Sequence, residues 1–179
     1  APTPAMIEVL GSALNARLAK ASPVIAPCPD LVALATAGQL PDYPDRQPEC
    51  TALLQMWGQP RTGCILLIGA GAATAATVTA LAHTLAVRPA EVLPSLRRLI
   101  DLSGLPAEQP DQFPALLAEL LNQMAGQEDL VLALPAVRDK PDSTIQHAYR
   151  TALAHALRGQ SPRCLCPVEP GAWRRWLEK

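Results

Sequence analysis

Residues 64–74 of this chain read CILLIGAGAAT. The apolar run is typical of a buried strand, and its change to Gly and Ala predicts a tight turn followed by the start of a helix. Small residues let backbone N–H groups approach a ligand, and a helix N-terminus carries a partial positive charge that suits an anion. The stretch therefore predicts a strand–turn–helix unit whose favoured ligand class is phosphate.

Gly69 and Gly71 match the first two glycines of the Gly-x-Gly-x-x-Gly pattern found in dinucleotide-binding turns, whereas Thr74 replaces the third. The acidic residue that such sites use about 20 positions later would be Glu91, which falls in a predicted helix and not at a strand end. Residues 75 and 76 are alanines where an ATP-hydrolysing phosphate loop needs Lys and Ser or Thr, which excludes hydrolysis of that type. The competing interpretation is that the glycines only permit a tight strand-to-helix connection.

Apolar runs and helix-period patterns alternate along the chain. Strands are expected at 24–26, 64–68, 129–135 and 164–168. Helices are expected at 4–20, 48–57, 72–86, 89–100, between Asp111 and Gly126, and at 143–158 and 171–179. Residues 30–37 fit either a helix capped by Asp30 or a strand. This alternation predicts a single α/β domain over residues 1–179, a three-layer sandwich with a mostly parallel sheet flanked by helices.

An irregular Pro-rich loop is expected at about residues 39–48. Its prolines and aspartates are typical of a surface connection, which is the favoured interpretation. The alternative is a specificity loop that lies beside the Gly/Ala turn.

A second polar loop follows the strand that ends at Pro135. In an open parallel sheet, ligand sites gather at the carboxyl ends of the strands, so Arg138 and Lys140 are expected near the Gly/Ala turn. Two cations beside a helix N-terminus would suit phosphate or carboxylate, and Asp139 or Asp142 could serve as a base or a magnesium ligand. The alternative is a solvated loop of mixed charge.

The charge distribution excludes one partner class. The 179 residues carry a formal net charge of -1, and the basic residues are scattered, so no nucleic-acid partner is expected. No apolar run approaches the ~20 residues that a membrane span requires, and residues 1–5 lack the features of an uncleaved signal peptide, so we expect a soluble protein.

Five widely spaced cysteines favour a reducing cytoplasm, with a periplasmic or secreted mature chain as the alternative in which Cys28 and Cys50 form a disulfide. Cys164 and Cys166 share one strand face and are interpreted as small buried hydrophobes. One Cys-x-Cys pair is too little for zinc, so no metal site is expected.

Two functions remain open at this point, and neither implies catalysis. The first is binding of an anionic small molecule, phosphate- or carboxylate-bearing, by Gly69, Gly71, Thr74, Arg138 and Asp142. The second is a non-catalytic interaction or assembly subunit on a degenerate nucleotide-binding-like scaffold. In that case a protein partner or a second copy would bind through the Ala-rich helix faces or the C-terminal helix, which carries Trp173 and Trp176, and the competing role of that helix is docking on its own core.

Overall fold

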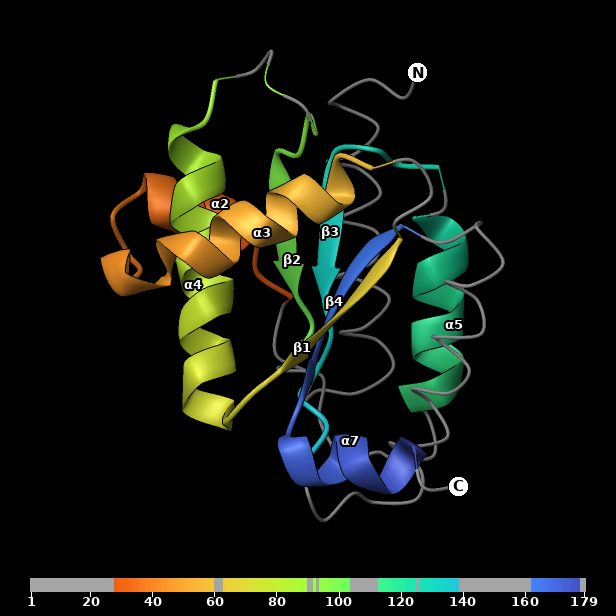
Figure 1. Cartoon of the computed structure of the whole chain (residues 1–179). Coiled ribbons are helices and arrows are strands. Elements are labelled where there is room, and N and C mark those ends of the chain that lie inside the picture. The colour runs from red at the N-terminus through yellow and green to blue at the C-terminus, as the bar shows by residue number, and fades with distance from the viewer. Residues whose placement is uncertain are drawn as a thin grey trace.

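The computed structural model describes residues 28–59, 63–89, 92, 94–103, 113–124, 126–138 and 162–177 (Figure 1). In chain order the elements are α2 (Leu31–Thr36), η1 (Pro44–Arg46), α3 (Gln47–Trp57), β1 (Cys64–Ile68), α4 (Gly71–Val87), β2 (Arg98–Asp101), α5 (Phe113–Gln123), β3 (Leu130–Ala133), β4 (Arg163–Val168) and α7 (Pro170–Leu177). The helices expected at 4–20 and 143–158 and the strand expected at 24–26 lie outside the described residues.

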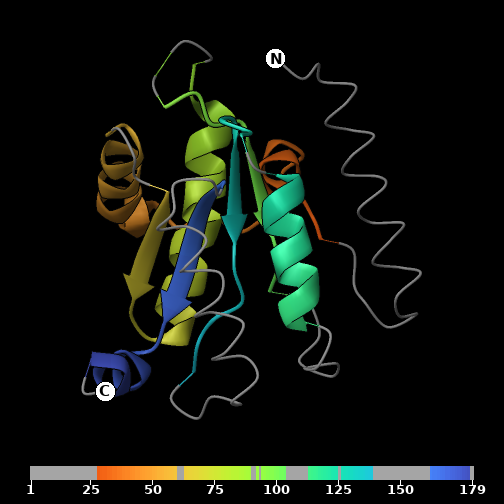
Figure 2. The ribbon, with the colours of Figure 1, turned by 90° about the vertical axis from the view of Figure 1, so that its right-hand side faces the viewer.

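The four described strands form one parallel sheet in the order β1-β4-β3-β2. Figure 2 looks onto this sheet, and its strands all run in the same direction. A parallel sheet is covered on both faces, so its interior is apolar, as in the inner strand β3, where all four residues are buried. The predicted α/β fold with a mostly parallel sheet is confirmed.

Alternate strand residues enter two separate hydrophobic clusters. Leu99, Val131 and Leu165 pack with α2, α3 and α4, whereas Leu132 and Cys166 pack with α5 on the opposite face. Figure 1 shows α4 on one side of the sheet and α5 on the other. The carboxyl ends of β1 and β4 lie at the same end of the sheet, next to α7 (Figure 2).

The helix expected at 89–100 is wrong, because residues 98–101 form strand β2. Pro94 would remove a helical hydrogen bond and clash with the preceding turn. Leu99 and Ile100 also face opposite clusters of the core, which requires extended backbone. Pairing with β3, about 30 residues away, overrides the local helix signal at Pro89.

Asp30 connects the start of α2 to the edge of the sheet. Its Oδ1 accepts from the N–H of Val32 at 3.0 Å and from the N–H of Leu99 at 3.3 Å, and its Oδ2 lies 3.5 Å from Arg98 Nε. The N–H of Asp101 donates to the carbonyl of Pro29. The expected N-cap is therefore confirmed, residues 31–36 are helical, and the outer edge of β2 is covered by residues 29–30.

The Pro-rich loop at 39–48 is attached to α4 by a histidine. His83 Nε2 lies 3.2 Å from the carbonyl oxygen of Leu40 and 3.0 Å from that of Pro41. The loop contains the short helix η1, and α3 already begins at Gln47. Residues 37–43 lie in no helix or strand, so the irregular connection is present but shorter than predicted, and it is held against α4.

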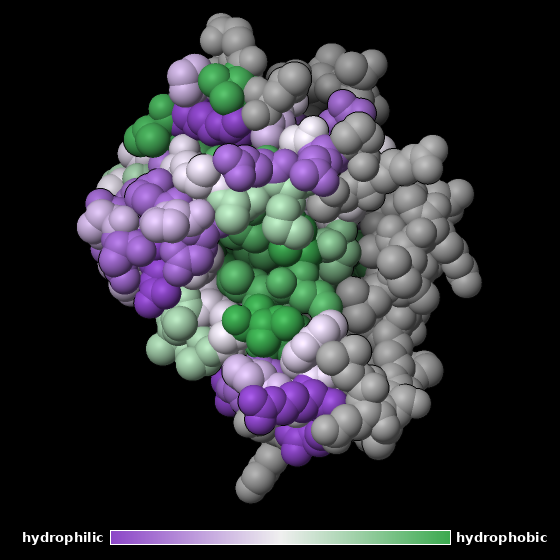
Figure 3. All heavy atoms as spheres, in the orientation of Figure 1, coloured by the Kyte–Doolittle hydropathy of each residue, from purple (hydrophilic) through white to green (hydrophobic). Residues whose placement is uncertain are grey.

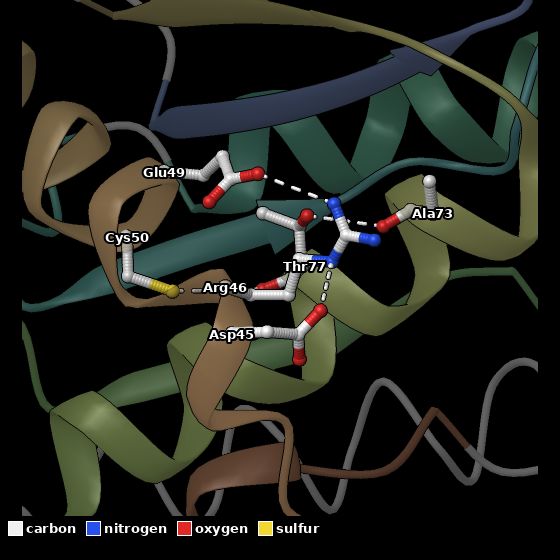
Figure 4. A network of polar contacts seen from close by, with 6 residues as sticks. All are labelled: Asp45, Arg46, Glu49, Cys50, Ala73 and Thr77. Atoms are coloured by element: carbon white, nitrogen blue, oxygen red, sulfur yellow. Dashed lines mark hydrogen bonds and ion pairs between the residues drawn. The ribbon is translucent and has the colours of Figure 1, made fainter.

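Polar contacts also join η1 and α3 and connect α3 with α4 (Figure 4). Arg46 lies 3.3 Å from a carboxylate oxygen of Asp45 and 3.2 Å from one of Glu49. The buried thiol of Cys50 lies 3.9 Å from the carbonyl oxygen of Thr77. Cys50 belongs to the cluster on the α4 side and Cys28 to the cluster on the α5 side, and both are free thiols, so the alternative of a Cys28–Cys50 disulfide is not realised.

Candidate functional site

The turn after β1 is short and close to β4. Only Gly69 and Ala70 separate β1 from α4, and the N–H of Gly69 donates to the carbonyl of Val168 at 3.1 Å. Ala70 is the N-cap of α4 and provides no side-chain cap. Of the described glycines only Gly38 and Gly126 have positive φ, so the glycines of this turn serve close approach and not a left-handed backbone.

Two side chains of the protein itself occupy the space beside these glycines. A Cβ on Gly69 would lie 3.3 Å from Cγ2 of Thr74, and a Cβ on Gly71 would lie 3.7 Å from Oε1 of Glu169. Thr74 is buried, and its hydroxyl donates to the carbonyl of Gly71 at 3.1 Å. The hydroxyl that was expected to meet a ligand is therefore used within the first turn of α4.

Glu169 is the functional candidate that the sequence pattern did not predict. It follows β4 directly, and its N–H donates to the carbonyl of Val137 at 2.8 Å. The parallel register pairs Ile68 with Val168, which brings Glu169 beside the N-terminal end of α4. A carboxylate near a helix N-terminus is stabilising there, as a phosphate would be. The available signal was an acidic residue directly after a strand, at the edge where ligands gather.

Arg138 lies on the other side of β4 from the Gly/Ala turn. Val137 pairs with Val168 as an isolated parallel bridge, so both the turn and the start of the second loop flank the end of β4. Arg138 is exposed. The structure thus brings Gly69, Gly71, Thr74 and the backbone at Arg138 to one edge, whereas Lys140 and Asp142 lie outside the described residues.

Residues 64–87 contain neither Lys nor Arg. Within the described residues no group of three His, Cys, Asp or Glu side chains could hold a metal ion. The arrangement can hold a helix N-terminus against a carboxylate, and it provides no described nucleophile or general base aimed at a ligand.

The C-terminal helix docks on its own domain through one of its two tryptophans. Trp173 is half-buried, and its side chain packs against the α5-side cluster. Its backbone N–H donates to the carbonyl of Glu169, which is the first hydrogen bond of α7. Arg174 and Arg175 are exposed. The side chain of Trp176 lies outside the described residues, so its expected role in a contact surface stays a prediction.

An apolar area lies along the β1 edge of the sheet. Figure 3 shows hydrophobic residues gathered in the middle of the face that carries β1 in Figure 1. Ile68 is 44% exposed, and Leu66 and Leu67 are partly buried against opposite clusters. β1 has one strand neighbour in the described sheet, β4. Along the part of the chain that the structure covers, no helix has the length and apolar character needed to cross a bilayer.

Comparison with known proteins gives a fold and no family. No family model matches the chain, and no curated protein matches it. Among solved structures it is similar to Hsp104 of S. cerevisiae in a complex with casein in the extended conformation, with a TM-score of 0.61 and 15% sequence identity. The match covers 84% of this chain and 27% of the Hsp104 chain, so this chain spans about a quarter of that protein. This similarity supports the α/β fold of the chain.

Proposed function

We propose that this chain is a non-catalytic protein-interaction domain built on a nucleotide-binding-like scaffold whose anion position is used internally. The observation that carries the proposal is the position of Glu169 beside the first residue of α4, where its Oε1 lies 3.7 Å from a Cβ built on Gly71. The negative charge that a nucleotide phosphate would bring is already supplied by the protein at this end of the helix.

The composition of the turn supports the same proposal. Ala75 and Ala76 stand where phosphate chemistry would need Lys and Ser or Thr. The methyl group of Thr74 lies 3.3 Å from a Cβ built on Gly69, which narrows the space in which a phosphate oxygen could approach the Gly69 backbone.

The competing candidate is binding of an anion at Gly69, Gly71, Thr74, Arg138 and Asp142. The observation that favours it is the N-cap of α4, because Ala70 offers no side-chain oxygen to the first N–H groups of this 17-residue helix. Coordination of a phosphate by those N–H groups would require Glu169 to turn away.

A thermal-shift comparison separates the two functions. Wild type and Glu169→Gln are heated with ATP and magnesium, and separately with inorganic phosphate. A ligand at a hundredfold over its dissociation constant stabilises by ~2.7 kcal/mol, which raises Tm by roughly 5–10 °C in a chain of this size. We expect no shift for wild type, and a shift of that size in wild type would show that the anion-binding function is correct.

Sedimentation velocity tests the proposed role in protein interaction. Sedimentation velocity is measured at several protein concentrations for wild type, Ile68→Lys and Trp176→Ala. Since Ile68 is 44% exposed, a lysine there adds a charge without opening the core. We expect wild type to self-associate as its concentration rises, and we expect this association to weaken in at least one variant while the far-UV circular dichroism spectrum is retained. Identical behaviour of all three proteins would remove both surfaces from consideration.

A further inference from the structure

Three cysteines that are remote in sequence meet on the α5 face of the sheet. Cys64 opens β1, and Cys164 and Cys166 lie in β4, where the register pairs Cys64 with Cys164 and Leu66 with Cys166. Because strand residues alternate between faces, all three thiols point to the same cluster. The Sγ atoms of Cys64 and Cys166 are 3.2 Å apart.

The two sulfur atoms are in contact but are not bonded. A disulfide has an S–S length of about 2.05 Å, so the two sulfur atoms would have to approach by roughly 1.2 Å. β1 is an edge strand with β4 as its one neighbour in the described sheet, so a small movement of β1 does not have to displace a strand on its other side.

We propose that Cys64 and Cys166 are an oxidisable dithiol that closes to a disulfide between β1 and β4 on reaction with a low-molecular-weight disulfide such as oxidised glutathione. This inference does not depend on the proposed function. Cys64 is half-buried and Cys166 is 0% exposed, so Cys64 is the thiol that meets the oxidant.

The reaction proceeds in two exchange steps. Cys64 gives its proton to water, and its thiolate attacks one sulfur of oxidised glutathione. A mixed disulfide forms, and the first glutathione leaves as a thiolate that takes a proton from water. Cys166 then gives its proton to water and displaces the second glutathione, which is protonated in turn. Two protein thiols are oxidised, and one glutathione disulfide is reduced to two thiols.

The electrostatics of the pair assign the same roles. A hydrogen bond from the Cys166 thiol lowers the pKa of Cys64, against the effect of burial, whereas the same bond and burial raise the pKa of Cys166 well above its usual value. A lower pKa increases the thiolate fraction of Cys64 near neutral pH, and the thiolate is the attacking species.

Cys164 does not compete for this reaction. It is 2% exposed, and its thiol donates to the carbonyl of Pro162 at 3.4 Å. Burial raises its pKa, which keeps it protonated. Cys164→Ser therefore serves as a matched control, since it changes a thiol of the same cluster and leaves the reacting pair intact.

The test uses the full chain with all five cysteines, first reduced and then incubated with oxidised glutathione. After acid quenching and unfolding, free thiols are counted by alkylation, and the linked peptides are identified by mass spectrometry without reduction. We expect the loss of two free thiols and a peptide that joins residues 64 and 166, in wild type and in Cys164→Ser. In Cys64→Ser and Cys166→Ser we expect no such cross-link.

The Cys166→Ser variant separates the two exchange steps. In Cys166→Ser the reaction should stop at a stable glutathione adduct on Cys64, because the second thiol is missing. The proposal is overturned if wild type keeps all its thiols, if it stops at the adduct on Cys64, or if a cross-link joins any other pair. A folded state for each variant is confirmed by circular dichroism before oxidation.

Discussion

Replacing Asp30 by alanine should destabilise the protein more than its position at the edge of the fold suggests. One oxygen of Asp30 accepts from the N–H groups of Val32 and Leu99, and the other lies 3.5 Å from Nε of Arg98. The side chain therefore caps α2 and also covers one N–H at the outer edge of β2. Asp30→Ala removes all three contacts and leaves the backbone of the fully buried Leu99 without this acceptor.

The magnitude follows from the separate contacts. Loss of an N-cap costs about 1 kcal/mol. A buried donor left without its acceptor costs about 1–3 kcal/mol. The ion pair with Arg98 is partly exposed and contributes less than about 1 kcal/mol. We expect Asp30→Ala to lower the free energy of unfolding by roughly 2–4 kcal/mol, which corresponds to a fall in Tm of roughly 5–15 °C for a chain of this length.

Thermal and urea unfolding, followed by circular dichroism, measure this loss. Asp30→Asn is the matched variant, because its amide oxygen can still accept from Val32 and Leu99, and it should lose only about 1 kcal/mol. Arg98→Gln removes the ion pair alone and should lose no more than that. The reasoning fails if Asp30→Asn is as unstable as Asp30→Ala, since charge and not hydrogen bonding would then dominate.

Three further predictions concern packing and protonation. Gly69→Ala should lower the free energy of unfolding by about 1–3 kcal/mol, because its Cβ would lie 3.3 Å from the methyl group of Thr74. Thr74→Ser removes that methyl group, so the double variant should lose less stability than the sum of the two single losses. Leu81→Ala, at a 0% exposed position, should cost about 2–5 kcal/mol in urea unfolding, whereas Val87→Ala, at 83% exposure on the same helix, should stay within about 0.5 kcal/mol. Burial raises the pKa of Cys28 from 9.0 to about 11, so the unfolded state loses this proton at a lower pH than the folded state does. Stability should therefore fall as pH rises from 9 to 11. Cys28→Ala should show a shallower fall in Tm over that range, and an unchanged slope would contradict the assignment.

Most of the parallel core could be predicted from local patterns. The apolar runs at 64–68 and 129–135 contain β1 and β3, and the run at 164–168 covers all of β4 except its first residue. The patterns at 48–57 and 72–86 match α3 and α4 to within one residue at each end. These segments are long, strongly apolar or periodic, and their neighbours on the chain carry clear turn residues. In these segments the local sequence pattern and the burial in the folded protein favour the same secondary structure, so the pattern alone predicted it.

β2 could not be predicted in the same way. Its four residues follow a segment in which Pro89 resembles a helix start, and their extended conformation depends on β3 and on the acceptors supplied by Pro29 and Asp30. The strand order β1-β4-β3-β2 is also non-local, because it joins the first described strand to the last. Contacts between segments about 100 residues apart leave no periodic signal in either segment.

The same limit explains why Glu169 was missed at the candidate site. Gly69, Gly71 and Thr74 are adjacent in sequence, so their turn could be predicted, but their use by the protein depends on a residue that the register of β1 with β4 brings to them. The dithiol has the same origin. Cys164 and Cys166 were correctly predicted to share a face, and the proximity of Cys64 became visible only with the pairing of the two strands.

The carboxylate of Glu169 sets a quantitative limit on any anion at the start of α4. Two like charges about 4 Å apart repel by about 1 kcal/mol in water and about 4 kcal/mol near a protein surface. Glu169 is half-buried, so an anion at this end would lose roughly fivefold to a thousandfold in affinity unless the side chain turned away. Glu169→Gln removes this repulsion and also the favourable interaction of the carboxylate with the helix, worth about 0.3–1 kcal/mol. If the variant is slightly less stable yet is stabilised by phosphate when wild type is not, then Glu169 occupies the anion position of this scaffold. If neither protein responds to phosphate, the narrow turn formed by Thr74 and Gly69 excludes the anion by itself.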